Sequence, residues 1–218
     1  MVPRGVTHLT FQTDRSVCYR PRMAKGPETR ERIVAKAATV FNERGFFGSS
    51  MTDLLAATGL QKGGLYNHFA SKEQLALASF DYAVALVEDR YRVALAGRTG
   101  ALERLHAIVD VIRRLIDEPA LPGGCPILNT AIEADDTMPA LRDRARAAMT
   151  DWQKMIGATV KAGVESGELR PGTDPYAVAT IVTATLEGAV FLSKLYADPV
   201  YMHRAVEHVS GYVRGLAA

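Results

Sequence analysis

The hydrophobic and polar positions of this chain recur with the spacing of α-helices. Apolar residues three and four positions apart form stripes, as at Ile33, Ala37, Val40 and Phe41, and each stripe predicts one buried helix face. Gly, Pro and Ser residues separate the stripes, and no segment has the convincing alternation of a strand. The pattern predicts an all-α protein of about nine helices, at residues 27–44, 52–58, 62–69, 71–95, 102–116, 126–136, 139–166, 175–196 and 199–215.

Short-range signals mark where several of these helices begin and end. Ser50 with Asp53, and Ser71 with Gln74, have the spacing of capping boxes, in which side chains bond free backbone N–H groups. Gly45 follows the first stripe and is expected to end that helix in the left-handed conformation. Three short N-terminal helices are thus followed by a long one, which would join them to a larger C-terminal bundle.

Composition excludes little, but the charge is unevenly distributed. The 218 residues allow one large or two small domains, and 48% hydrophobic and 23% charged residues indicate a globular protein rather than a disordered or fibrous one. The formal net charge is only +2. Residues 1–75 hold 11 Lys and Arg against 6 Asp and Glu, whereas residues 76–218 hold 15 against 18. The basic N-terminal third favours a nucleic-acid partner there.

The sequence also indicates a cellular setting. Two cysteines, Cys18 and Cys125, are too few for a disulfide framework, so we expect a reducing cytoplasm. No uninterrupted run reaches the ~18 apolar residues of a membrane span, and no signal-peptide core is present near the start. For residues 1–26 we expect a disordered arm or translation that starts at Met23; a basic arm that adds DNA contacts is the alternative.

A candidate helix-turn-helix lies in the basic third. Two short helices meet at residues 57–61 after a longer helix, which is the arrangement that places a second helix in the major groove of DNA. Leu65 and Phe69, four residues apart, would face inward, while the polar side chains between them face outward. Lys72 begins the next helix, where free backbone N–H groups also favour a phosphate.

The residues of this motif resemble a known family. Residues 62–69, Lys-Gly-Gly-Leu-Tyr-Asn-His-Phe, followed by 71–75, Ser-Lys-Glu-Gln-Leu, closely resemble the signature of the TetR family of bacterial repressors. The resemblance covers about residues 28–75, and Gly-Gly-Cys-Pro at 123–126 resembles an element of one subgroup. It implies a helix-turn-helix domain at 27–75, with the motif itself at about 50–69. It also implies a ligand-binding and dimerisation domain at 76–218, with a homodimer interface on the last two long helices, about 175–215.

The resemblance also implies which residues contact DNA. Base edges would be contacted by Lys62, Gly63, Gly64 and Asn67, and phosphates by Tyr66, His68, Lys72 and the helix start near Ser50 and Thr52. Gly64 departs from the commoner Ala, Ser or Thr, so readout shifts towards Lys62, Gln61 and Asn67. The alternatives are structural: Tyr66 covering a core edge, His68 as a surface histidine and Lys72 as a solvated lysine.

The C-terminal bundle is expected to hold an apolar effector pocket with a few polar groups. The candidates are Phe80, Tyr91, Cys125, Leu128, Asn129, Glu133, Trp152, Met155, Ile156, Tyr176, Thr180, Glu187 and Phe191, with ordinary core packing as the alternative for each. Glu187 lies in an uncharged run from 175 to 193, so it needs a partner at a dimer contact or in a ligand. Cys125 precedes a predicted helix start, which would lower its thiol pKa and make it a redox or electrophile sensor, unless it is simply a small buried residue.

These observations favour a ligand-responsive transcriptional repressor, released from palindromic operator DNA by a small apolar or amphipathic molecule. No nucleophile elbow, phosphate loop or metal-ligand spacing is present, so we expect no enzyme, cofactor or metal. A non-specific DNA-compacting protein would need a uniformly basic surface, against which the excess of acidic residues over 76–218 argues.

Overall fold

The computed structural model describes residues 25–134 and 137–218, and within them the regular structure is helical. The helices are α1 (Lys25–Gly48), α2 (Met51–Thr58), α3 (Lys62–Tyr66), α4 (Lys72–Leu95), α5 (Ala101–Asp117), α6 (Pro126–Ala134), α7 (Pro139–Glu165), α8 (Pro175–Tyr196) and α9 (Val200–Arg214). The all-α prediction and the order of its helices are confirmed for the described residues. The arm expected over 1–26 lies outside them, except that residues 25 and 26 begin α1.

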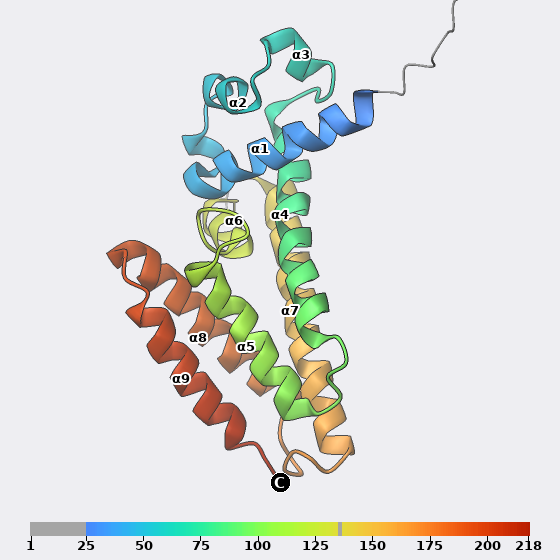
Figure 1. Cartoon of the computed structure of the whole chain (residues 1–218), viewed down its shortest axis with the longest axis vertical. Coiled ribbons are helices and arrows are strands. Elements are labelled where there is room, and N and C mark those ends of the chain that lie inside the picture. Colours follow the sequence, from blue (N-terminus) through green and yellow to red (C-terminus); the bar gives the residue numbers. More distant parts are fainter. Residues whose placement is uncertain (1–24, 135–136) are drawn as a thin grey trace, which may run out of the picture.

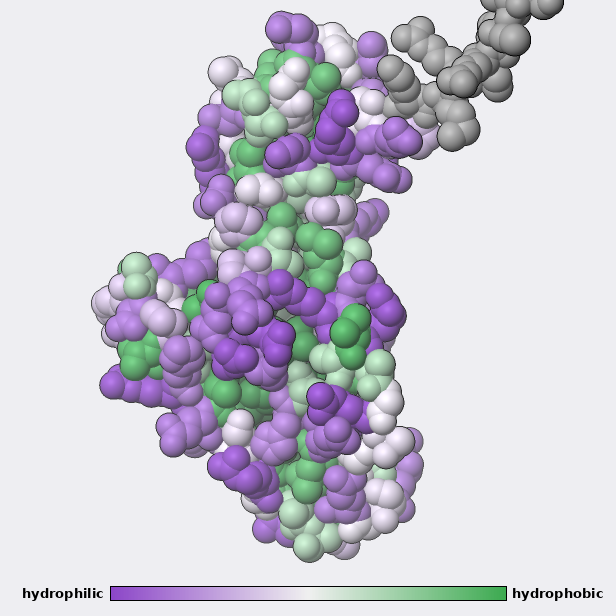
Figure 2. Space-filling view, viewed as in Figure 1, coloured by the Kyte–Doolittle hydropathy of each residue, from purple (hydrophilic) through white to green (hydrophobic). Residues whose placement is uncertain are grey.

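The helices form a small head on a larger body (Figure 1). α1, α2 and α3 make the head, and α4 runs from the head down along the body, where α7 lies beside it. α5, α8 and α9 pack together on the other side of the body, and α6 lies between α1 and the body helices. Figure 2 shows a waist between head and body, with polar and apolar residues mixed over this face. α4 and α6 are therefore the elements that cross from one part to the other.

Each part has its own hydrophobic core. The head core contains Ile33, Val34, Ala37, Leu54, Leu65, Phe69 and Leu75. The body core is larger and includes Leu105, Ile108, Ile112, Ile156, Leu186 and Met202. α4 contributes Leu75 to the first and Phe80 to the second, so burial of one helix in two cores joins head and body.

Some helix ends differ from the prediction. Gly45 has a non-helical backbone, with φ 74° and ψ 174°, so the helix is interrupted where the sequence predicted its end; one further turn follows this kink and completes α1 at Gly48. α3 ends at Tyr66 rather than near residue 69, and α9 begins at Val200, with Pro199 before it. Both predicted capping serines are confirmed: Ser50 accepts from the N–H of Asp53, and Ser71 accepts from the N–H of Gln74, each at 3.1 Å.

Candidate functional site

The start of α2 is fixed by a complete capping box. Ser50 Oγ accepts from the N–H of Asp53, and the Asp53 carboxylate accepts from the N–H of Ser50 at 2.8 Å and from Arg44 Nη1 at 2.8 Å. The bonds from Ser50 hold the pKa of Asp53 below its usual value. Ser50 therefore serves as a helix cap, while Thr52 beside it is exposed at the same helix end.

The second helix of the motif presents its predicted outer face to solvent. Gly59 ends α2 in the left-handed conformation at φ 69°, and α3 starts three residues later. Leu65 and Phe69 are buried in the head core, as predicted from their spacing. The exposed residues of this turn and helix include Gln61, Lys62, Gly63, Tyr66 and Asn67, while Gly64 and His68 are half-buried.

Lys72 differs from the expectation of a phosphate-facing ammonium. Its Nζ donates to the backbone carbonyl of Phe46 and lies 4.1 Å from the centre of the Phe46 ring. Partial burial lowers the pKa of Lys72, against the opposing effect of Glu133 nearby. Lys72 thus ties the start of α4 to the end of α1.

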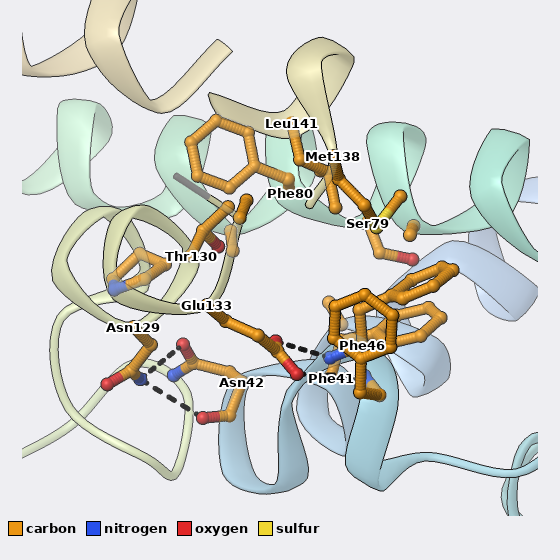
Figure 3. A pocket seen from close by; sticks show the side chains of 16 residues that line it. Phe41, Asn42, Phe46, Ser79, Phe80, Asn129, Thr130, Glu133, Met138 and Leu141 are labelled. Atoms are coloured by element: carbon orange, nitrogen blue, oxygen red, sulfur yellow. Dashed lines mark hydrogen bonds between the residues drawn. The ribbon is translucent and has the colours of Figure 1, made fainter. Parts of the chain in front are cut away.

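Glu133 of α6 bonds the same turn of α1 (Figure 3). Its Oε2 accepts from the N–H of Phe46 at 2.6 Å, and its Oε1 accepts from the N–H of Phe47 at 2.8 Å. The close approach depends on Gly45, because a Cβ at that position would lie 2.5 Å from either carboxylate oxygen. The body thereby holds the last turn of the first head helix through one carboxylate.

A network of side-chain amides lies next to this contact, as Figure 3 also shows. Asn129 Nδ2 donates to the Asn42 carbonyl at 3.1 Å and to the Gly123 carbonyl at 2.8 Å. Asn42 Nδ2 donates to the Pro122 carbonyl at 2.6 Å, and Lys194 Nζ donates to Asn129 Oδ1 at 2.8 Å. These bonds join α1, the loop before α6, α6 and α8 at the waist.

Three of the predicted effector residues lie at this waist. Phe80, Asn129 and Glu133 line a crevice of about 30 Å³. This is room for about one water molecule rather than for an organic effector. They lie where head and body meet and do not line the larger cavity of the body.

A larger cavity of about 310 Å³ lies deeper in the body. It is lined by Val84, Val87, Glu88, Tyr91, Arg92, Leu95, Ile112, Leu115, Cys125, Pro126, Ile127, Ala148, Asp151, Trp152, Met155 and Glu187, which come from α4, α5, α6 with its preceding loop, α7 and α8. The structure thus brings together five of the predicted residues: Tyr91, Cys125, Trp152, Met155 and Glu187.

Polar atoms in the cavity wall lack partners. Tyr91 Oη, Trp152 Nε1 and Glu187 Oε2 are buried with no hydrogen-bond partner among the described residues. The other oxygen of Glu187 accepts from Cys125 Sγ at 3.1 Å. Buried polar groups in proteins are normally bonded, so unpaired ones in a cavity mark a place for a ligand or ordered water.

Burial changes the titration of the cavity groups. It raises the pKa of Glu187 to about 7, with the bond from Cys125 acting in the opposite direction. Burial and the nearby Glu187 carboxylate raise the pKa of the Cys125 thiol well above its usual value. The expected lowering at a helix start is therefore wrong, because desolvation and a neighbouring acid outweigh the helix N-terminus.

Five other predicted residues lie outside this cavity. Ile156 is fully buried in the body core and Leu128 packs against that core. Tyr176, Thr180 and Phe191 are exposed on α8, with Tyr176 85% and Phe191 49% exposed, so their prediction as pocket walls is corrected.

Sequence reasoning also missed residues of the cavity. Glu88, Arg92 and Asp151 stand at its rim and are exposed. Their spacing gave no signal, because charged residues on an outer helix face look alike whether or not a cavity opens beside them.

Proteins similar in sequence are transcriptional regulators. Residues 33–79 match the family described as bacterial regulatory proteins, tetR family, and residues 101–209 match the tetracyclin repressor-like C-terminal domain. An HTH-type transcriptional regulator of Mycobacterium tuberculosis is 31% identical over 180 residues, covering 80% of this chain and 87% of that protein. The HTH-type transcriptional repressor DhaR of Mycobacterium sp. strain GP1 is 29% identical and covers 79% and 85%.

A solved structure supports the same assignment. A TetR transcriptional regulator from Chloroflexus aurantiacus is 47% identical, covers 89% of this chain and 98% of that chain, and has a TM-score of 0.86. The matched families and relatives are DNA-binding regulators, not enzymes. With a helix-turn-helix head and a helical C-terminal body, this chain belongs to the TetR family of transcriptional regulators.

Proposed function

We propose that the protein is a homodimeric repressor of the cytoplasm that leaves its operator when a small molecule fills the body cavity. The observation that carries this proposal is the position of α6. Its first residues, Pro126 and Ile127, line the cavity, and Glu133 in its last turn bonds the backbone of the head. A shift of this one short helix would therefore change both the shape of the cavity and the bonds that hold the head.

The proposed DNA contacts are the exposed side chains at the start of α3 and the start of α2. Gln61, Lys62 and Asn67 are the groups proposed for base edges, with Gly63 and Gly64 allowing close approach. Tyr66, His68 and Thr52 are proposed for phosphates. For Lys72 a phosphate contact requires that it leave the Phe46 carbonyl, so its proposed role includes holding the head in place.

The proposed dimer face lies on α8 with α9 beside it. By length and composition α8 could cross a membrane, yet half of that stretch is buried inside the fold. Its outer side exposes several large apolar residues: Tyr176, Ile181, Phe191, Leu192, Leu195 and Tyr196. Large apolar side chains exposed on one helix are typical of an interaction site, and a twofold dimer would cover them without a membrane.

The proposed switch is a change in population between two arrangements of the head. A ligand that binds better when α6 is displaced would weaken the bonds from Glu133 to Phe46 and Phe47. The two heads of a dimer would then lose the spacing of successive major grooves, roughly 34–36 Å. Coupling of this kind is typically worth about 1–3 kcal/mol.

A gel-shift titration tests the proposal. The DNA upstream of the protein's own gene should bind more tightly than an unrelated duplex of equal length. Lys62→Ala or Asn67→Ala should change preference at particular bases, whereas Tyr66→Phe should weaken binding to all sequences alike. Equal affinity for every duplex would instead support a DNA-compacting protein.

A further inference from the structure

The chemistry of the body cavity restricts the ligand it can take. Tyr91, Trp152 and Glu187 are each more than nine-tenths buried and each leaves one polar atom unbonded in its wall. A carboxylate oxygen accepts hydrogen bonds, an indole N–H donates and a phenol can do either. The missing partner must therefore carry at least one donor, placed near Glu187 Oε2.

The charges around the cavity favour a cation. Glu187 inside and Glu88 and Asp151 at the rim are carboxylates, and Arg92 is the cationic side chain among the lining residues. Arg92 already donates to Asp89 from two of its nitrogens at 3.1 Å. Asp151 likewise accepts from Lys154 at 3.2 Å, so Glu88 and Glu187 are the lining carboxylates without an ion-pair partner among the described residues. An anionic ligand would meet these two carboxylates without a free counter-charge.

No protein group supplies the counter-charge of Glu187 in the described structure. Lys194 is the nearest candidate on the same helix, but its ammonium donates to Asn129 Oδ1 at 2.8 Å. The neighbour that Glu187 does have, the Cys125 thiol, is neutral because its pKa is raised. A neutral ligand would leave this carboxyl group without a charged partner.

The rest of the wall suits an apolar body. Val84, Val87, Leu95, Ile112, Leu115 and Ile127 contribute aliphatic surface. The rings of Tyr91 and Trp152 line the same space, and aromatic faces attract organic cations.

We propose that this cavity binds a monocationic amine with an apolar body, whose ammonium donates to Glu187 Oε2. The apolar part then lies against the aliphatic side chains of α4 and α5, beside the Trp152 ring. This inference rests on the proposal that the cavity is the effector site, and it names the chemical class of that effector.

The binding should depend on pH with a defined sign. Glu187 has a pKa of about 7, whereas the pKa values of Tyr91 and Cys125 are raised well above their usual range, so both stay neutral. The other ionisable groups that line the cavity are Glu88, Arg92 and Asp151, and Lys194 lies on the same helix as Glu187. Affinity for an ammonium should therefore rise about tenfold from pH ~6 to pH ~8, as Glu187 loses its proton.

The lone tryptophan of the chain, Trp152, supplies the readout. Its fluorescence can be titrated with phenylbutylammonium, phenylbutanol and phenylbutyrate, which share one apolar body and differ in charge. At pH ~8 the ammonium should bind about tenfold tighter than the alcohol, and the carboxylate weakest. Glu187→Gln should abolish the advantage of the ammonium, while the exposed Glu165→Gln on α7 should keep it.

The outcomes separate this inference from the effector role. Equal or tighter binding of the alcohol, or affinity for the ammonium that does not change with pH in the unaltered protein, overturns the proposed class even if Glu187→Gln fails to fold. If the alcohol both binds and releases operator DNA, the effector role stands without the cation. If the ammonium binds as expected but leaves operator affinity unchanged, the ligand class holds and the effector role fails.

Discussion

At the scale of single residues, Glu187 gives the protein a pH-dependent stability. Its pKa rises from 4.5 to about 7 on folding, so the folded state holds this proton more tightly than the unfolded state. The folded state is then favoured below pH ~4.5 and loses that advantage as the pH rises through ~7. The loss is on the order of 3 kcal/mol, since each unit of pKa is worth about 1.4 kcal/mol.

Glu187→Gln should remove this loss. The amide has no proton to release, so we expect the variant to be more stable than the parent at pH ~8 and similar to it at pH ~5. Urea unfolding at the two pH values and one protein concentration measures the difference. If the free energy of unfolding of the parent does not fall from pH ~5 to pH ~8, the raised pKa of Glu187 is contradicted. The control Glu165→Gln should show the same fall as the parent.

Gly64 in α3 offers a second test at one residue. A Cβ added there would lie 3.8 Å from the Leu60 side chain, an ordinary contact, and the backbone is not left-handed. Gly64→Ala should therefore stabilise the head by about 0.5–1 kcal/mol, because alanine loses less backbone entropy in a helix. Thermal unfolding measures the change in stability. Gly59→Ala should destabilise the head instead, because Gly59 has a φ of 69°, which alanine adopts only with strain.

What the sequence could predict at this scale was limited to local chemistry. Glu187 was identified because it interrupts an apolar run, and the partner expected for it was a dimer contact or a ligand, not a side chain of the same chain. Its partner Cys125 lies 62 residues away, and no local signal joins the two. Burial of the thiol, together with the Glu187 carboxylate, raised the pKa that the sequence predicted to be lowered.

At the scale of helices, local signals predicted the ends that local bonds control. Ser50 and Ser71 cap their helices through residues three positions later, which a sequence pattern contains. The last turn of α1 was missed because its N–H groups bond Glu133, 86 and 87 residues away. Tertiary contacts of this length decide a helix end without leaving a pattern in the sequence.

The orientation of α8 was likewise beyond the sequence. Tyr176, Thr180 and Phe191 were expected in the pocket, but they share the exposed side of the helix with Leu195. α8 is apolar on both sides, so periodicity alone could not say which side enters the core. Glu187, four residues before Phe191, is nevertheless buried, and it is the one charged residue among the side chains that α8 buries.

The contact between α6 and α1 leads to a prediction about local dynamics. Glu133→Gln keeps the shape of the side chain but loses one charge-assisted acceptor for Phe46 and Phe47. Such a bond is worth about 1.5–3 kcal/mol, so amide hydrogen exchange at these two residues should accelerate about tenfold or more. Operator affinity should fall at the same time, because the head is held less firmly.

Glu165→Gln again provides the matched control, since Glu165 is an exposed carboxylate on α7 near its end. In Glu165→Gln, the rate of amide hydrogen exchange at Phe46 and Phe47 should equal that in the parent. Unchanged exchange in Glu133→Gln would mean that the body does not hold the head through this carboxylate.

At the scale of the whole molecule, the helical head carries little of the positive charge that the first third of the sequence holds. Residues 26–75 hold 6 Lys and Arg against 5 Asp and Glu, so most of the excess in the first third lies in residues 1–25. The affinity of the head for DNA must then depend on where Lys62, Tyr66 and the helix starts are placed. A single small head contacts few bases, and pairing of two heads in a dimer supplies the specificity that one lacks.

The dimer can be tested at the centre of the exposed side of α8. Phe191 is 49% exposed beside Leu192 and Leu195, which are 37% and 60% exposed. Phe191→Glu would place a charge in the apolar contact, and loss of a central aromatic residue alone costs about 2 kcal/mol or more. The dimer dissociation constant should rise by about thirtyfold or more, as measured by sedimentation equilibrium.

Operator affinity should fall together with dimerisation, because a monomer reaches only one half-site. Val93→Glu is the matched control: Val93 is 66% exposed on α4, outside the proposed interface, so the same change there should leave the dimer intact. A Phe191→Glu protein that remains dimeric at concentrations where the parent is dimeric would exclude this side of α8 as the interface. A monomer that still binds the full operator with parental affinity would instead show that the heads act independently, and the proposed switch through their spacing would fail.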